Sequence, residues 1–144
     1  MYEHILHPTD GSEGSADAAA HAIDLAKRYG ASLHVLYVVE TDMVPDADTF
    51  NIYTALEGAG ETAVDEAVER AKEAGVESVQ ASIARGRPDR EIVRYVEDED
   101  VDLVVMGTHG RTGIERYLLG SVAEKVVRTC PVPVLTVRAP EGEA

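Results

Sequence analysis

The sequence predicts a single α/β domain built on an open parallel sheet with helices on both faces. Short apolar runs that fit strands alternate along the chain with stretches in which small and apolar residues recur at three- and four-residue spacing, as on one face of a helix. This alternation calls for parallel strands joined by right-handed helical crossovers. At 144 residues, with no internal repeat, linker or low-complexity tract, the chain is expected to form one domain over residues 1–144.

Five strands are expected, at residues 2–7, 32–39, 79–84, 101–106 and 132–138. The fourth is the clearest, because Leu103, Val104, Val105 and Met106 form a continuous apolar run of the kind found in a buried parallel strand. The third alternates only weakly between apolar and polar residues.

Four helices are expected between the strands, at residues 15–29, 56–74, 89–99 and 121–129. Gly30 and Gly75 stand where C-cap glycines belong, and Pro88 suits a first helical position. The third helix should be buried through Ile92, Val93 and Val96. Residues 40–52 show no clear period and are expected to form a mobile loop.

The composition is strongly acidic. Thirteen Lys and Arg residues against 27 Asp and Glu residues give a formal net charge of −14, which opposes nonspecific binding to nucleic acid or to an anionic membrane. Because the acidic residues are spread along the chain, we hypothesise a halophilic protein, the alternative being an ordinary acidic one. Molar salt would raise the unfolding midpoint of a halophilic protein, whereas a flat or falling midpoint would exclude that hypothesis.

The sequence also predicts a soluble, cytoplasmic protein. The single cysteine, Cys130, cannot form an intrachain disulfide and should pack as a small hydrophobe. We see neither a charged leader followed by an apolar segment nor a run of 18 apolar residues. No membrane and no nucleic-acid partner is therefore expected.

A glycine-rich segment, Gly107-Thr108-His109-Gly110, follows the fourth strand, and Gly120-Ser121 opens the last helix. Glycines let the backbone approach a ligand closely, so that successive N–H groups converge on phosphate oxygens, and the start of a helix adds free N–H groups and a positive dipole end. The alternative is a plain connecting loop. Neither the GxGxxG dinucleotide fingerprint nor a lysine-bearing P-loop is present.

In open α/β sheets, ligands bind beyond the carboxyl ends of the strands, where the strand order reverses. The loop after the first strand, Pro8-Thr9-Asp10-Gly11-Ser12, and the loop after the fourth strand are the two candidate walls of such a site.

Along nearly its whole length the chain resembles the universal stress protein (UspA-like) family. The nucleotide motif of that family, G-x2-G-x9-G-[ST], is matched by Gly107, Gly110, Gly120 and Ser121. Three further segments are similar to family landmarks: the Pro8 to Ser12 loop, the turn Gly86-Arg87-Pro88, and the final strand Cys130-Pro131-Val132-Pro133-Val134-Leu135. Residues 41–60 match poorly.

The resemblance implies a five-stranded parallel sheet in the order 3-2-1-4-5, with the reversal between the first and fourth strands. It also implies binding of ATP or a related adenine nucleotide, in the subgroup that keeps the motif. From the chemistry of phosphates, a Mg²⁺ or Mn²⁺ ion would then be bound mainly through the nucleotide and water. A homodimer is implied too, formed by edge-to-edge pairing of the last strand, residues 132–138.

The residues expected to bind the nucleotide come from both loops, the second strand and the start of the last helix. Asp10 would contact the adenosine end and Val38 would present backbone groups to the adenine, whereas the segment from Gly107 would wrap the ribose and phosphates. The full set is Pro8, Thr9, Asp10, Val38, Gly107, Thr108, His109, Gly110, Arg111, Thr112, Gly113, Gly120, Ser121, Val122 and Ala123.

Several of these residues have a second interpretation. Asp10 fits an N-cap of the first helix with Glu13 as its capping-box partner, and Ser121 forms the same S-x-x-E pattern with Glu124. Val38 fits plain core packing. Arg111, the only cation of its segment, suits either phosphate chelation or a solvated surface.

No catalytic residue is assigned. His109 has no carboxylate partner that can be placed beside it, and no pair of the five histidines has metal-ligand spacing on one element. The leading hypothesis is a stress-response protein whose nucleotide occupancy alters its shape, dimer state or choice of partner. A slow ATPase and a nucleotide-free dimeric interaction module are the alternatives.

Overall fold

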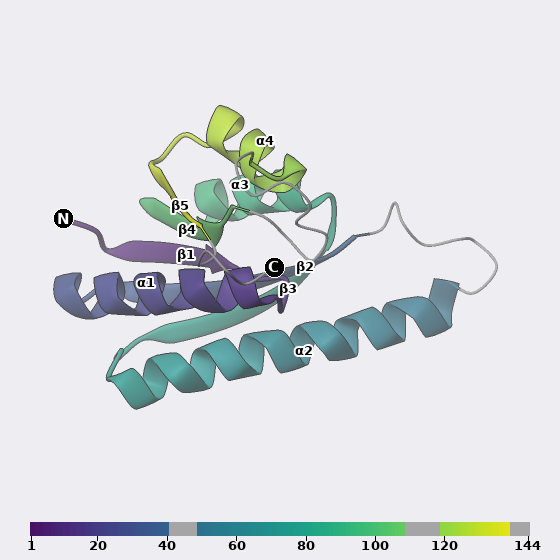
Figure 1. The fold of residues 1–144 in the computed structure, drawn as a ribbon, viewed down its shortest axis with the longest axis horizontal. Coiled ribbons are helices and arrows are strands. Elements are labelled where there is room, and N and C mark those ends of the chain that lie inside the picture. The colour runs from purple at the N-terminus through teal and green to yellow at the C-terminus, as the bar shows by residue number, and fades with distance from the viewer. Residues whose placement is uncertain (41–48, 109–118, 139–144) are drawn as a thin grey trace.

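The five strands form one all-parallel sheet in the order β3-β2-β1-β4-β5. The computed structural model describes residues 1–40, 49–108 and 119–138. Helices cover both faces of the sheet (Figure 1). The predicted fold class and strand order are therefore confirmed.

The strands lie close to their expected positions, at β1 His4–Pro8, β2 Ser32–Glu40, β3 Val79–Gly86, β4 Leu103–Gly107 and β5 Val134–Val137. β1 and β4 begin and end slightly later than expected, and β3 extends to Gly86. The expected fifth strand, residues 132–138, is shortened at both ends. Pro131 and Pro133 have no N–H to donate, so the β5 ladder begins at Val134.

The helices are α1 Glu13–Tyr29, α2 Thr49–Ala74, α3 Pro88–Asp98 and α4 Ser121–Thr129. Gly30 caps α1 in the left-handed conformation (φ 64°), and Pro88 lies in the first turn of α3, both as predicted. The prediction of a loop over residues 40–52 was wrong for its last residues, because α2 already begins at Thr49. The first turns of α2 extend past the edge of the sheet (Figure 1).

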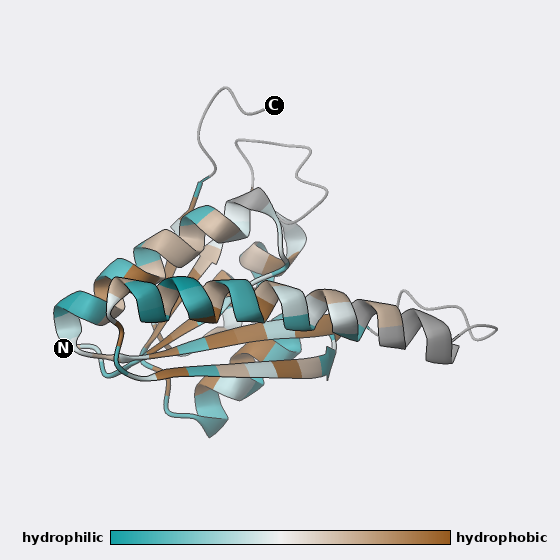
Figure 2. Cartoon of the chain, turned by 90° about the horizontal axis from the view of Figure 1, so that it is seen from below, coloured by the Kyte–Doolittle hydropathy of each residue, from teal (hydrophilic) through white to brown (hydrophobic). Residues whose placement is uncertain are grey.

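Two hydrophobic cores lie on the two faces of the sheet, because alternate strand residues point in opposite directions. Ile5, Val35 and Val105 pack against α1 and α2. Leu6 and Val104 pack on the other face against α3 and α4. In α3, Ile92 and Val96 are buried as expected, but Val93 is only half-buried. Figure 2 shows the apolar strands between helices whose outward faces are polar.

Half-buried Cys130 packs against the α3 and α4 core, as predicted, and burial raises the pKa of its thiol. Within the described ranges, none of the helices combines the length and the apolar character needed to cross a membrane.

Candidate functional site

The strand order places the ends of β1 and β4 side by side at the carboxyl edge of the sheet. β1 pairs with β2 on one side and with β4 on the other. The chain places β2 and β3 on one side of β1 and then β4 and β5 on the other side, so the strand order reverses between β1 and β4. Pro8 ends β1 and Gly107 ends β4. The two loops proposed as walls therefore begin on adjacent strands, where ligands bind in open α/β sheets.

The first wall is a hydrogen-bonded turn centred on Asp10. Its Oδ1 atom accepts hydrogen bonds from the backbone N–H of Ser12 (2.9 Å) and from the hydroxyl of Ser15 (2.7 Å). The Ser15 hydroxyl oxygen also accepts the N–H of Asp10 (3.1 Å), and Ser15 is 7% exposed. These bonds hold the Asp10 carboxylate in place on the loop.

The N-cap of α1 is Ser12, whose side chain accepts the N–H of Ser15. The predicted capping box of Asp10 and Glu13 is therefore wrong. Asp10 instead forms the preceding turn, because its carboxylate reaches the N–H two residues on before the helix begins. Gly11, with φ of 80°, provides the left-handed backbone that this turn requires.

Thr9 connects the first wall, the loop after β1, to the sheet by a hydrogen bond. Its N–H donates to the carbonyl of Leu36 on β2 (2.8 Å), and its side-chain oxygen accepts the N–H of Gly11 (3.1 Å). The wall is thus fixed at both Thr9 and Asp10.

The second wall is closed by Thr108. Its N–H donates to the carbonyl of Val137 on β5 (3.0 Å), and its carbonyl accepts the N–H of Gly120 (2.7 Å). The second bond joins the two ends of the glycine-rich segment, so Gly107 and Gly120 lie close together although they are far apart in sequence. The predicted site residues His109, Gly110, Arg111, Thr112 and Gly113 lie outside the described residues.

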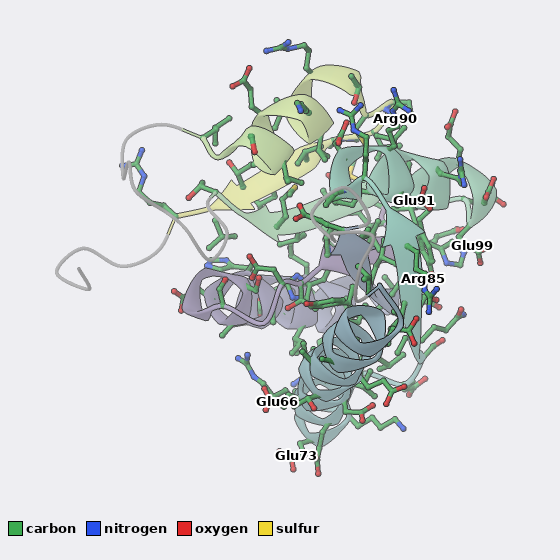
Figure 3. All side chains as sticks on the ribbon, turned by 90° about the vertical axis from the view of Figure 1, so that its right-hand side faces the viewer. Glu66, Glu73, Arg85, Arg90, Glu91 and Glu99 are labelled. Atoms are coloured by element: carbon green, nitrogen blue, oxygen red, sulfur yellow. The ribbon has the colours of Figure 1, made fainter. Side chains whose placement is uncertain are left out.

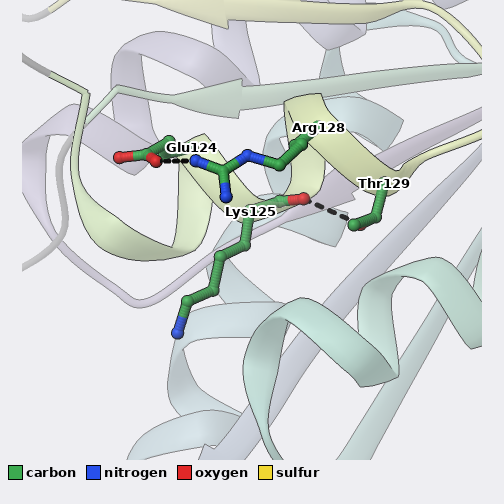
Figure 4. Close-up of polar contacts among 4 residues, drawn as sticks. All are labelled: Glu124, Lys125, Arg128 and Thr129. Carbon is green, nitrogen blue, oxygen red and sulfur yellow. Dashed lines mark hydrogen bonds and ion pairs between the residues drawn. The ribbon is translucent and has the colours of Figure 1, made fainter.

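Helix α4 begins without the predicted capping box of Ser121 and Glu124. Its N-cap is Gly120, whose carbonyl accepts the N–H of Glu124 (2.9 Å), and Ser121 is the first helical residue. The Glu124 carboxylate forms an ion pair with Arg128 one turn later, next to the Thr129 hydroxyl that donates to the Lys125 carbonyl (Figure 4). A serine inside the helix has lost the extended backbone that lets an N-cap side chain fold back.

The first turn of α4 therefore presents backbone N–H groups to the carboxyl edge. No described side chain caps them, and the helix dipole adds positive potential at the same point. Ser121 is exposed, Val122 half-buried and Ala123 buried. This arrangement suits an anion.

Val38 lies on β2 beyond the last residue pair that β2 makes with β1, which is Leu36 with Pro8. On its other side Val38 pairs with Ala84 of β3. Its half-buried side chain packs against the α3 and α4 core, which agrees with the core-packing interpretation. Its backbone on the β1 side lies beyond the β1–β2 ladder.

Sequence reasoning missed His7, which lies directly under the first wall and is 1% exposed. Its Nδ1 atom contacts the carbonyl of Val105 (3.1 Å), linking β1 to β4 at the reversal, and its Nε2 atom has no partner among the described residues. Burial lowers the pKa of His7 to about 4. The positive charge of Arg70 adds to this shift, whereas the hydrogen bond with Val105 and the negative charge of Asp10 oppose it. The signal was a histidine directly after the apolar residues Ile5 and Leu6 of the strand.

Acidic side chains gather elsewhere, on the outer face of α2. A shallow hollow there is lined by Glu66, Glu69, Arg70 and Glu73, and Glu66 and Glu73 point away from the sheet (Figure 3). Its charge repels anions, so it does not compete with the carboxyl edge as a site for phosphate. Across the described parts of the chain, no three His, Cys, Asp or Glu residues are grouped to hold a metal ion.

Residues 1–138 match the model of the universal stress protein family. The chain belongs to this family. A similar relative is the universal stress protein MJ0531 of Methanocaldococcus jannaschii, 40% identical over 99% of this chain and 86% of the relative. Both the predicted resemblance and its extent are thereby confirmed.

Two solved structures of universal stress proteins or their relatives are also similar. The structure of MJ0577, from Methanocaldococcus jannaschii, superposes with a TM-score of 0.89 at 30% identity over 99% of both chains. A universal stress protein in complex with cAMP superposes with a TM-score of 0.76 at 28% identity, covering 96% of this chain and 99% of that one.

Proposed function

We propose that this universal stress protein binds ATP or a related adenine nucleotide at the carboxyl edge of its sheet and acts as a nucleotide-dependent regulator. The observation that carries the proposal is the hydrogen bond from Gly120 to Thr108, which closes the glycine-rich segment against the start of α4 beside the Asp10 turn. The similar universal stress protein bound to cAMP supports an adenine nucleotide as the ligand.

The site divides into two halves. The Asp10 carboxylate and the backbone of Val38 face the adenosine end, with Pro8 and Thr9 behind them. The segment from Gly107 to Gly113 and the first N–H groups of α4, at Ser121, Val122 and Ala123, receive the phosphates. Backbone N–H groups bind phosphate without needing a basic surface, so a protein of net charge −14 can still hold a polyanion.

In this proposal Arg111 chelates phosphate oxygens, and Mg²⁺ or Mn²⁺ is held mainly by the phosphates and water. The regulator works in the cytoplasm in the response to stress. Its role in this proposal is to bind the nucleotide, and slow hydrolysis of ATP is the alternative.

We also propose that the protein is a homodimer whose β5 strands pair across a two-fold axis. β5 is an edge strand, and its Leu135 is 39% exposed. An exposed apolar edge is a liability that pairing with a second copy removes. Sedimentation equilibrium should give twice the monomer mass of 15.5 kDa, and Leu135→Lys should yield monomers; a wild-type monomer at high concentration would contradict the dimer.

The nucleotide proposal is tested on the purified protein. Mass spectrometry after denaturation should detect a co-purified adenine nucleotide, and isothermal titration with ATP, ADP and cAMP in Mg²⁺ should show saturable binding at one site per chain. A folded protein that carries no nucleotide and gives no heat with any of the three would contradict the proposal.

Asp10→Asn and Asp10→Ala separate the role of Asp10 in the turn from its role in binding. Asparagine keeps the oxygen that accepts from Ser12 and Ser15, so we expect Asp10→Asn to unfold within about 0.5 kcal/mol of wild type while binding ATP more weakly. Alanine removes the acceptor, and the free energy of unfolding should fall by about 1–3 kcal/mol. Chemical denaturation and calorimetry measure both. Unchanged affinity in Asp10→Asn would exclude a ligand role for the carboxylate charge.

Ser121→Ala tests the start of α4. Because Ser121 is the first helical residue and not the N-cap, its substitution should change the free energy of unfolding by less than about 0.5 kcal/mol, well below the ~1 kcal/mol typical of a lost cap. The affinity for ATP should nevertheless fall, because the hydroxyl faces the phosphates. A large loss of stability with unchanged affinity for ATP would show that Ser121 stabilises the helix and does not bind the ligand.

A further inference from the structure

A chain of ring contacts connects three elements at the amino-terminal edge of the sheet, away from the nucleotide site. His4 on β1 contacts His34 on β2 through Nδ1 and Nε2 (3.2 Å), and His34 Nδ1 contacts the Tyr95 hydroxyl on α3 (2.7 Å). The ring centroids are 5.4 Å apart for the two histidines and 5.5 Å apart for His34 and Tyr95. Burial raises the pKa of the Tyr95 hydroxyl, and Ser82 on β3 opposes that shift.

The two histidines differ in their access to protons. His34 is 2% exposed, whereas His4 is half-exposed at the first residue of β1. Both nitrogens of His34 face a partner, so its protonation state is tied to the directions of two hydrogen bonds.

Only one proton fits between the two imidazoles. If Tyr95 donates to His34 Nδ1, then His34 carries its proton on Nε2 and donates to His4 Nδ1. In the opposite direction, His4 donates from Nδ1 to His34 Nε2, and His34 donates from Nδ1 to Tyr95. In either direction the pair accepts one added proton while a single N–H remains between the rings.

A second added proton cannot be held in this geometry. It would place an N–H on both facing nitrogens, 3.2 Å apart, and two positive charges on adjacent rings. The rings would have to separate, and His34 is the side chain through which Tyr95 hydrogen-bonds β2.

The charged groups around His4 and His34 favour the uptake of one proton by the pair. Glu99, at the end of α3, acts electrostatically on both His34 and Tyr95 and favours one positive charge on the pair. The Asp102 carboxylate, before β4, accepts the backbone N–H groups of Glu3 (2.9 Å) and His4 (3.2 Å). Burial and then the His4 charge lower the pKa of His34. The facing residue on β3, Ser82, is neutral.

We propose that His4 and His34 share one proton as a unit, and that uptake of a second proton breaks their contact and loosens α3 from the sheet. The device is an acid-responsive latch between β1, β2 and α3. Tyr95 is its positioning residue, because it transmits the state of the histidine pair to the helix.

The test follows the ring nitrogens and the backbone amides of the full-length protein by NMR from pH 8 to pH 4 at constant salt. In wild type, His4 Nδ1 and His34 Nε2 should shift together through one step that adds one proton in total. A second step at lower pH should coincide with faster amide exchange in α3 relative to α1, whose amides report global unfolding. Two rings that each titrate fully and separately would overturn the proposal.

Two variants isolate the latch. Tyr95→Phe keeps the ring but removes the hydroxyl, so the histidine pair should still take up its first proton as a unit while the α3-specific step in exchange disappears. Persistence of that step in Tyr95→Phe would overturn the role given to Tyr95. His21→Gln, which removes an exposed imidazole on α1, is the matched control and should leave both steps unchanged; a shift of either would indicate a general charge effect and contradict the latch.

Discussion

Lowering the pH from 7 to 4 is expected to remove about 3 kcal/mol of folding free energy through His7 alone. The folded protein holds the pKa of this buried imidazole at about 4, against an ordinary value of 6.5. Between these two values the unfolded chain binds a proton that the folded protein does not. The contribution is therefore complete above pH 6.5 and is lost as the pH falls to about 4.

The measurement is the free energy of unfolding by urea at several pH values, for wild type and for His7→Leu. Leucine fills a similar volume and cannot titrate, so the pH dependence should flatten by about 3 kcal/mol over this interval, whatever the stability of the variant at pH 7. His21→Gln, at an exposed position, should retain the wild-type slope. Parallel curves for wild type and His7→Leu would show that His7 is protonated as easily in the folded protein as in the unfolded one.

Gly60→Ala is expected to destabilise the protein by about 1–3 kcal/mol, even though alanine is the better helix former. Gly60 lies where α2 crosses β2, and a Cβ atom there would stand 2.6 Å from Cδ1 of Tyr37. The Tyr37 ring is 6% exposed and packs within the α1 and α2 core. The ring cannot move aside without displacing its neighbours, so the helix must shift away from the sheet.

Gly58→Ala is the matched control, because it makes the same change in the same helix. A Cβ at Gly58 has no atom within 4 Å, so this variant should gain about 0.5–1 kcal/mol from helix propensity alone. Thermal and urea unfolding of the two variants should therefore move in opposite directions. Stabilisation of both would mean that α2 does not pack tightly on Tyr37.

Much of the fold follows from local patterns in the sequence. The apolar run from Leu103 to Met106 is buried as β4, and Gly30 and Pro88 mark helix ends in the structure as they do in the sequence. These features depend on residues close together in the chain. The strand order rested on the family resemblance, and similarity to solved structures confirms it.

What the sequence did not predict depends on tertiary structure. The loop after β1 contains several residues that can cap a helix, and only the folded backbone selects Ser12 over Asp10. The contact between His4 and His34 depends on the register of β1 against β2, which pairs His4 with Ser32.

The proposed nucleotide site is tested most directly by following backbone amide resonances during titration with ATP and Mg²⁺. We expect saturable shifts at Thr9, Asp10 and Val38, at Gly107 and Thr108, and at Gly120 to Ala123, with little change along the acidic outer face of α2. The strand order and the hydrogen bond from Gly120 to Thr108 bring these positions to one edge of the sheet. No saturable shifts, or shifts confined to the other end of the sheet, would contradict the proposed site.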